Sequence, residues 1–138
     1  MTMKPVVQNE RTGCGIASVA ALAGVSYTRV KTRANKLGIF ADDPKLWSDT
    51  GYVRTLLGKY GMSASRKERK FVSWKQLPDL ALLAIKWHRE KGKPFWHWVV
   101  FVRENDLSYV LDSRKALKMN RRTDFGRMKP KWFIEVYA

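Results

Sequence analysis

Cys14, the only cysteine of this 138-residue chain, lies where a helix of small residues is expected to begin. The first N–H groups of a helix have no partner within it and form the positive end of its dipole, so a thiol placed there tends to lose its proton and become a nucleophile. A lone cysteine with a distant histidine and aspartate is a candidate catalytic set whose members meet only after folding. His97 and Asp112 complete such a set here.

The residues around Cys14 bear on whether its thiol is reactive or a small buried hydrophobe, the commoner role of a single cysteine. Gly13 and Gly15 on either side would let a substrate backbone approach and suit a sharp turn into a helix. Thr12 is available as the helix N-cap. Upstream, the side-chain amide of Gln8 could donate to a developing oxyanion beside the Cys14 N–H. These neighbours favour the reactive thiol.

A predicted β-hairpin places His97 next to Asp112. Residues 95–103 alternate as a strand, with His97 near its start, and residues 107–111 return antiparallel after a polar turn. Because a hairpin brings the ends of its strands together, Asp112 is expected beside His97. This pairing argues against the alternative that His97 is a core histidine. The alternative for Asp112, a turn residue followed by Ser113, is a common role and stays open. The other histidine, His88, lies in a predicted turn and is expected to face solvent.

These residues resemble the papain-like cysteine peptidase superfamily, and most of all its bacteriocin-processing double-glycine leader peptidases and their stand-alone relatives. The resemblance rests on Gln8, the GCG around Cys14, the AxxAALAG helix that follows, the HWVVFV strand with His97 and the YVLDS strand with Asp112. It extends in order over nearly the whole chain.

The resemblance implies a role for each matched residue. In that family the glutamine supplies an oxyanion-hole donor, the cysteine is the nucleophile, the histidine is general base and acid, and the aspartate orients the histidine. These roles fall on Gln8, Cys14, His97 and Asp112. The implied activity is hydrolysis of a peptide or related amide bond in a peptide or protein substrate. Gly13 departs from the acidic or polar residue of many relatives, the helix lacks a second cysteine and no transporter segment accompanies the domain; these departures bear on the substrate more than on the chemistry.

The expected fold class is α+β: a papain-like N-terminal helical half, with a buried cysteine-bearing helix, packed on a C-terminal antiparallel β-sheet. Helices are expected over residues 13–23, 27–37 and 50–60, with Ser26 capping the second, and strands over 62–66, 80–87, 95–103, 107–111 and 132–137. The apolar run at 80–87 fits a strand or a buried helix. Residues 88–94 look like a hairpin connection, which favours the strand.

Length and composition predict one domain, residues 1–138, with a helical half over about residues 1–61 and a sheet half over about residues 62–138. Hydrophobic residues make up 45% of the chain and charged residues 28%, as in globular proteins. No apolar run could span a membrane, and no signal peptide is recognisable. One cysteine excludes an internal disulfide and fits a reducing compartment, so a cytoplasmic protein is expected. No cofactor is expected, and one cysteine with two poorly spaced histidines gives no metal site.

Charge is the unusual property of the chain. There are 27 Lys and Arg against 12 Asp and Glu, a formal net charge of +15. Such an excess fits an acidic protein partner or nucleic acid bound through the basic surface, and it fits a merely solvated basic surface equally well. Two alternatives to an enzyme follow: a papain-like binding module whose cysteine no longer reacts, and a basic nucleic-acid-binding protein. No known nucleic-acid-binding motif supports the second.

Overall fold

The computed structural model describes residues 3–138. Its first helix, α1 (Cys14–Ala23), is buried from its first residue to Leu22, because small and apolar residues occupy all of its faces. It ends at Gly24, whose φ of 70° is the left-handed conformation that glycine adopts readily after a helix. The predicted position of this helix is confirmed.

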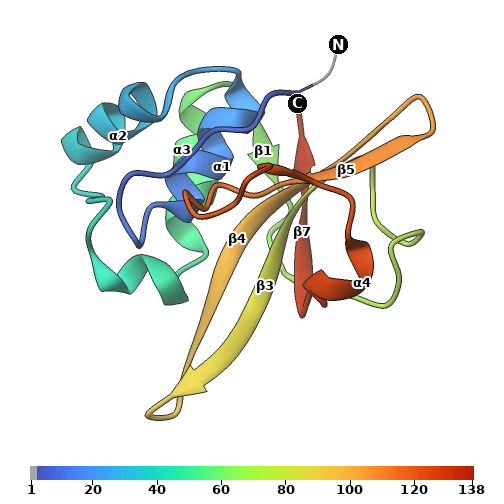
Figure 1. Cartoon of the computed structure of the whole chain (residues 1–138). Helices are drawn as coiled ribbons and strands as arrows, with labels where there is room; N and C mark the ends of the chain where they lie inside the picture. Colours follow the sequence, from blue (N-terminus) through green and yellow to red (C-terminus); the bar gives the residue numbers. More distant parts are fainter. Residues whose placement is uncertain (1–2) are drawn as a thin grey trace.

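Further helices pack around α1. Ser26 caps α2 (Tyr27–Lys36) by accepting a hydrogen bond from the Arg29 N–H, as the sequence predicts. The short 3₁₀ helix η1 (Pro44–Ser48) lies in a segment expected to be a loop, and α3 (Gly51–Lys59) follows it. α1 contacts α2, α3 and the sheet, and Figure 1 shows α1, α2 and α3 gathered on one side of that sheet. Within residues 3–138, no helix has the length and apolar character needed to cross a membrane.

The chain beyond α3 forms an antiparallel sheet with the strand order β1–β7–β3–β4–β5–β6, and β2 also pairs with β7. Its strands are β1 (Ser63–Ala64), β2 (Arg69–Lys70), β3 (Leu80–Glu90), β4 (Lys93–Glu104), β5 (Leu107–Leu111), β6 (Arg121–Arg122) and β7 (Trp132–Tyr137). The last strand therefore lies inside the sheet, beside β3 (Figure 1). The fold is α+β, with an N-terminal helical half packed on a C-terminal antiparallel sheet.

Strand β4 separates two apolar cores. Trp98 and Val100 belong to the larger core, which lies between the sheet and the helices. Val99 and Phe101 belong to a smaller core on the other face, against which Trp74 packs. The alternation predicted for this strand is therefore confirmed. His97 precedes the part of β4 that pairs with β5, which begins at Val100.

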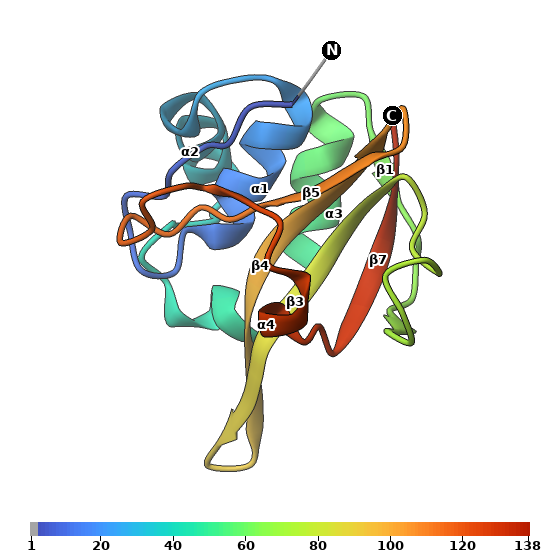
Figure 2. The same cartoon turned by 45° about the vertical axis from the view of Figure 1, so that its right-hand side comes forward.

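The hairpin between β3 and β4 is longer than predicted. Residues 88–94, expected to be a connection, continue both strands, and the turn is confined to Lys91 and Gly92. Both turn residues have positive φ, 51° and 78°, as a two-residue hairpin turn requires. The prediction that His88 lies in a turn is therefore wrong, because it lies on β3. Figure 2 shows this extension projecting from the sheet; residues 86–95 are called the arm below.

The segment between β5 and β7 is rich in Lys and Arg and is partly structured. It includes β6 and the short helix α4 (Phe125–Met128). β6 pairs with β5 through Val110 opposite Arg122 and Leu111 opposite Arg121. This pairing carries the chain back past the end of β5, so that side chains of β6 reach the residue that follows β5.

Candidate active site

The structure brings His97 and Asp112 into contact, as the hairpin predicts. β5 pairs with β4 only from Val100 onward, where it lies opposite Leu111. The next residue of the returning chain, Asp112, therefore comes level with the unpaired part of β4. His97 Nε2 lies 2.8 Å from Asp112 Oδ1, a hydrogen bond in which the ring N–H donates to the carboxylate.

Asp112 is fully buried and its carboxylate is surrounded by donors. Arg122 Nη1 donates to Oδ2 at 2.9 Å, and the Arg114 backbone N–H donates to Oδ1 at 3.2 Å. Burial alone would raise the pKa of Asp112, but the hydrogen bond from His97 and the nearby arginines lower it far below its usual range. The carboxylate is therefore ionised at neutral pH.

The ionised carboxylate changes the acidity of His97. The imidazole is almost buried, with 12% of its side chain exposed, and burial would lower its pKa. The hydrogen bond to Asp112 and the interaction with the Cys14 side chain outweigh burial and raise the pKa of His97 to about 9. The ring is therefore protonated at neutral pH. Because Nε2 is bonded to Asp112, Nδ1 is the nitrogen left to exchange a proton with a thiol.

Cys14 stands at the first residue of α1, with its thiol against β4. The Trp98 backbone N–H donates to Cys14 Sγ at 3.4 Å, so the sulfur lies beside the residue that follows His97. The thiol is fully buried. Thr12 does not cap the helix, because the N-cap is Gly13 without a side-chain bond and the Thr12 hydroxyl donates to a distant backbone carbonyl.

Gly13 and Gly15 flank Cys14 for a reason other than the expected one. A Cβ on Gly13 would lie 2.1 Å from the Tyr27 hydroxyl, and one on Gly15 would lie 2.0 Å from the Tyr52 hydroxyl. The two glycines therefore make room for two tyrosines rather than for a substrate. Burial and the nearby Cys14 raise the pKa of Tyr52 well above its usual range, so its hydroxyl keeps its proton.

Gln8 lies close to the other candidates and is held on both sides. Its backbone N–H donates to the Ser113 carbonyl at 2.9 Å, and the Ser113 hydroxyl donates to Gln8 Oε1 at 2.6 Å. Its Nε2 donates to the carbonyls of Glu10 and Arg11 at 2.8 and 3.0 Å. Both amide N–H groups are thus engaged, and donation to an oxyanion requires one of these bonds to be exchanged.

Two side chains that the sequence did not single out hold Asp112 in place. The Asn120 side chain donates from Nδ2 to the Asp112 carbonyl at 2.7 Å, and the Asn120 backbone carbonyl accepts from the Asp112 N–H at 2.8 Å. Arg122 bridges Asp112 to Asp124, with two bonds of 2.9 and 2.7 Å to the second carboxylate. The only sequence signal for Arg122 was its place in a basic stretch. Which cation of that stretch reaches Asp112 depends on the pairing of β6 with β5.

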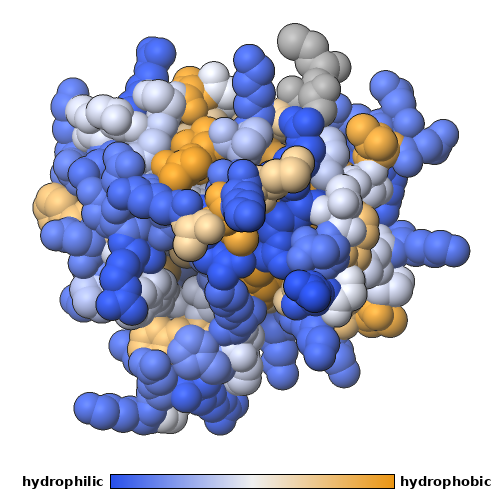
Figure 3. Space-filling view, in the orientation of Figure 1, coloured by the Kyte–Doolittle hydropathy of each residue, from blue (hydrophilic) through white to orange (hydrophobic). Residues whose placement is uncertain are grey.

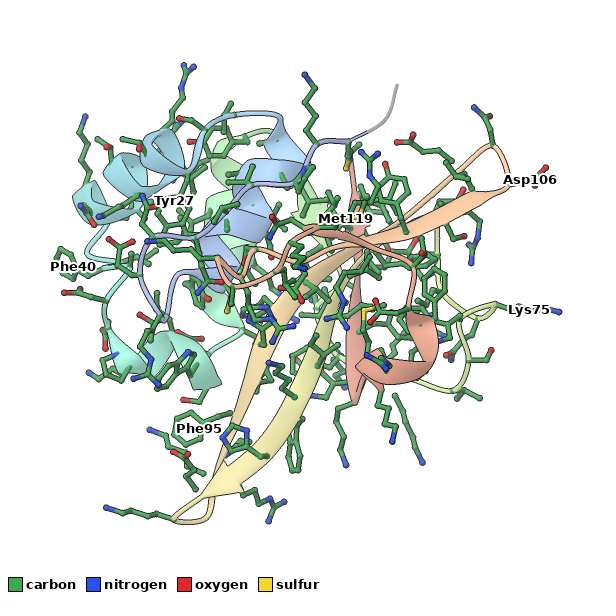
Figure 4. The ribbon with its side chains drawn as sticks, viewed as in Figure 1. Tyr27, Phe40, Lys75, Phe95, Asp106 and Met119 are labelled. Carbon is green, nitrogen blue, oxygen red and sulfur yellow. The ribbon has the colours of Figure 1, made fainter. Side chains whose placement is uncertain are left out.

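A cleft of about 680 Å³ opens beside His97 and Gln8. Its walls come from the segment before α1, from η1, from the arm and from the loop after β5. At one end Trp47 of η1 packs edge-to-face on Phe95 of the arm, with ring centroids 6.1 Å apart. Figure 4 shows Phe95 on the side of the arm that faces η1, and Figure 3 shows that this face of the molecule is mostly hydrophilic, with separate apolar patches.

His88 takes no part in the contact between His97 and Asp112. It lies on the arm with 54% of its side chain exposed, its Nδ1 bonded to the Lys86 carbonyl and its Nε2 3.4 Å from Glu90. Within residues 3–138, no group of three His, Cys, Asp or Glu side chains could hold a metal ion. Behind the cleft, the structure groups the Cys14 thiol, the His97 imidazole and the Asp112 carboxylate.

Comparison with solved structures relates this arrangement to a known fold. The chain is similar to the crystal structure of a double glycine motif protease from an AMS/PCAT transporter in complex with the leader peptide. The two share 20% sequence identity with a TM-score of 0.62 over 99% of this chain and 92% of that chain. No protein-family model matches the sequence, and no curated protein matches it significantly. What is shown is the fold: this chain folds like a papain-like protease of the double glycine motif type.

Proposed function

We propose that this protein is a cysteine peptidase in which Cys14 is the nucleophile, His97 the general base and acid, and Asp112 the residue that orients His97. The observation that carries the proposal is the 2.8 Å bond between His97 Nε2 and buried Asp112, which fixes the imidazole beside the thiol. The fold it shares with a double glycine motif protease supports the same reaction class.

The reaction is acyl transfer through a thioester. The thiol proton resides on His97 Nδ1, and the thiolate attacks the carbonyl carbon of the substrate while the C=O π electrons move to the oxygen. When the tetrahedral intermediate collapses, the C–N bond breaks and His97 gives its proton to the departing amine. Water, deprotonated by His97, then hydrolyses the thioester and releases the thiol. Asp112 keeps its negative charge throughout and stabilises the imidazolium.

The oxyanion is stabilised by two donors in this proposal. The Cys14 N–H is at the first turn of α1, where backbone N–H groups have no partner within the helix. Gln8 Nε2 is the second donor, and it exchanges its bond to the Glu10 or Arg11 carbonyl for one to the oxyanion. Such an exchange makes the donor available when substrate fills the cleft that Gln8 lines.

The substrate is a peptide. The structurally similar protease was crystallised with its leader peptide, and the cleft of this chain has the volume and the open walls to take several residues of an extended chain. A leader peptide cut after two glycines is the substrate that the resemblance suggests.

Thiol labelling tests the proposal without knowledge of the substrate. Iodoacetamide at mildly acidic pH should alkylate Cys14, because in the proposed mechanism the sulfur is the nucleophile and His97 takes up its proton. His97→Ala should slow the labelling at least tenfold, whereas His88→Ala, which changes the other histidine, should leave its rate within about twofold. Cys14→Ala should abolish peptide hydrolysis and preserve the circular dichroism spectrum.

The second candidate is a papain-like binding module with an unreactive cysteine. The complete burial of Cys14 is the observation that favours it. A module of this kind would bind peptides yet resist labelling in the native state, and the Cys14→Ala variant would bind as well as the wild type. Hydrolysis that persists unchanged in Cys14→Ala would exclude both candidates.

A further inference from the structure

The cleft beside His97 carries an excess of positive charge. Four cationic side chains line it, contributed by three separate segments of the chain: Arg11, Lys86, Arg114 and Lys115. Only two carboxylates, those of Glu10 and Glu90, line the same cleft. The charge is a property of this cleft rather than only of the outer surface, so it bears on what the cleft accepts.

The two carboxylates of the cleft already have partners. Glu10 accepts a hydrogen bond from the Tyr27 hydroxyl at 2.6 Å and forms an ion pair with Lys31, on the side of α2. Glu90 lies 3.4 Å from His88 Nε2, near the tip of the arm. Neither makes an ion pair with a cation of the cleft among residues 3–138. Of the four cations, only Arg114 has an ion-pair partner among residues 3–138, and that partner is the buried Asp112 rather than a carboxylate of the cleft.

Lys86 is placed at the cleft by an irregularity of β3. It follows Ile85, which lies opposite His97 in the sheet, and it begins the bulge that ends at His88. Its φ is 55°, a left-handed conformation that is unfavourable for a residue with a side chain and is found often at functional sites. Its ammonium has no ion-pair partner among the described residues. Lys86 and Arg114 line the same cleft. Burial and then the positive charge of Arg114 lower the pKa of Lys86.

Arg114 has hydrogen-bonding capacity left over. Its Nε lies 3.4 Å from Asp112 Oδ2, an ion-pair distance, and makes no hydrogen bond. One buried carboxylate is therefore shared by His97, Arg122 and Arg114. Lys86 and Arg114 both line the cleft that His97 lines, and an anion bound there would reduce the repulsion between like charges.

Resting on the proposed peptidase function, we propose that the cleft selects substrates with a carboxylate close to the bond that is cut, and that Lys86 and Arg114 bind this carboxylate. The ammonium supplies a point charge and the guanidinium a planar pair of donors, which together suit a carboxylate. The carboxylate belongs to an Asp or Glu side chain beside the cut bond or to the free C-terminus of a short peptide. Both present the same group to the pair.

Matched peptide substrates test the assignment. A library of quenched fluorescent peptides is first screened for cleavage, and each cleaved peptide is then made with Glu or Gln at every position flanking the cut, and with a free or amidated C-terminus. Glu peptides should be cut with a kcat/KM about tenfold to a hundredfold above that of their Gln partners, as charge-assisted hydrogen bonds allow. The preference should shrink as salt is raised. A gain with the free C-terminus alone would assign the terminal carboxylate.

A charge-matched pair of variants locates the effect. Lys86→Gln should reduce the ratio of Glu to Gln cleavage at least fivefold. Lys75→Gln removes the same charge from an exposed loop that Figure 4 shows far from the arm, and it should leave the ratio unchanged. Equal Glu and Gln rates in the wild type, or an equal change in both variants, would overturn the assignment.

A binding measurement distinguishes failure of this inference from failure of the proposed function. Fluorescence anisotropy with the Cys14→Ala protein measures the affinity of Glu and Gln peptides without cleavage. One outcome is that the wild type cleaves no peptide, while Glu peptides bind more tightly than Gln peptides and this difference depends on Lys86. The proposed peptidase function would then be wrong and the proposed anion site would be supported. If a single-stranded oligonucleotide binds with a greater dependence on Lys86 than any Glu peptide does, the peptide assignment is overturned.

Discussion

The Asp112 carboxylate lies within ion-pair distance of His97, Arg114 and Arg122, and these contacts determine how the site responds to pH. An isolated aspartate beside a histidine could take the proton itself, whereas Arg122 and Arg114 keep this one charged. The pKa of Asp112 is lowered and that of His97 is raised to about 9. Of Asp112 and His97, the residue expected to change its protonation state between pH 6 and pH 10 is therefore His97.

Deprotonation of His97 should be visible in the pH dependence of two properties of the wild type, kcat/KM and the free energy of unfolding. kcat/KM should fall as pH rises through about 9, because the imidazolium that donates to the leaving amine is lost. Stability should fall over the same range: the folded pKa of His97 lies above its unfolded value of about 6.5, so its contribution is complete below that value and disappears as pH rises through about 9. Urea unfolding from pH 6 to pH 10 measures it.

His97→Gln is the control for the pH series. The variant has no ionisable group at that position, so its unfolding free energy should vary less between pH 6.5 and pH 9 than that of the wild type. Parallel curves for the two proteins would show that His97 is not the group whose pKa is raised.

At the scale of the elements, α1 is the helix that the others pack against, and two glycines let tyrosines close over its first turn. Gly15→Ala should destabilise the fold by about 1–3 kcal/mol, because the new methyl group would overlap the Tyr52 ring and hydroxyl. Gly58→Ala is the matched control in α3, where a Cβ meets no atom within 4 Å. It should stabilise by about 0.5–1 kcal/mol through helix propensity. Chemical denaturation measures both.

Elements with strong local patterns were predictable from the sequence. Small residues bounded by Gly24 defined α1, Ser26 defined the start of α2, and alternation defined both faces of β4. The contact of His97 with Asp112 followed from one hairpin. These features depend on residues close together in the chain, so local physics was sufficient.

What the sequence did not reveal depends on long-range packing. The tyrosines that fill the space over Gly13 and Gly15 come from other helices, and no local pattern announces them. The hydrogen bond that Gln8 Oε1 accepts comes from Ser113, which is 105 residues away. The assignment of residues 88–94 to a connection was wrong because polar residues on a projecting hairpin resemble those of a loop.

At the scale of the whole molecule, the last strand is an internal member of the sheet. β7 pairs with β3 on one side and with β1 and β2 on the other, and Phe133, Ile134 and Val136 are buried. A chain that ends at Lys131 should lack a cooperative thermal transition, because its loss removes these apolar contacts and exposes two strand edges. A chain that ends at Tyr137 should melt like the wild type. Far-UV circular dichroism distinguishes them, and cooperative melting of the shorter chain would contradict the argument.

The bond between Gln8 and Ser113 joins the beginning of the chain to its last quarter, and Met3 likewise reaches Tyr109. During translation the sulfur of Cys14 leaves the ribosome long before the imidazole and carboxylate that would activate it. Under the proposed function, the three catalytic residues can meet only after Asp112 has been synthesised and the sheet has folded.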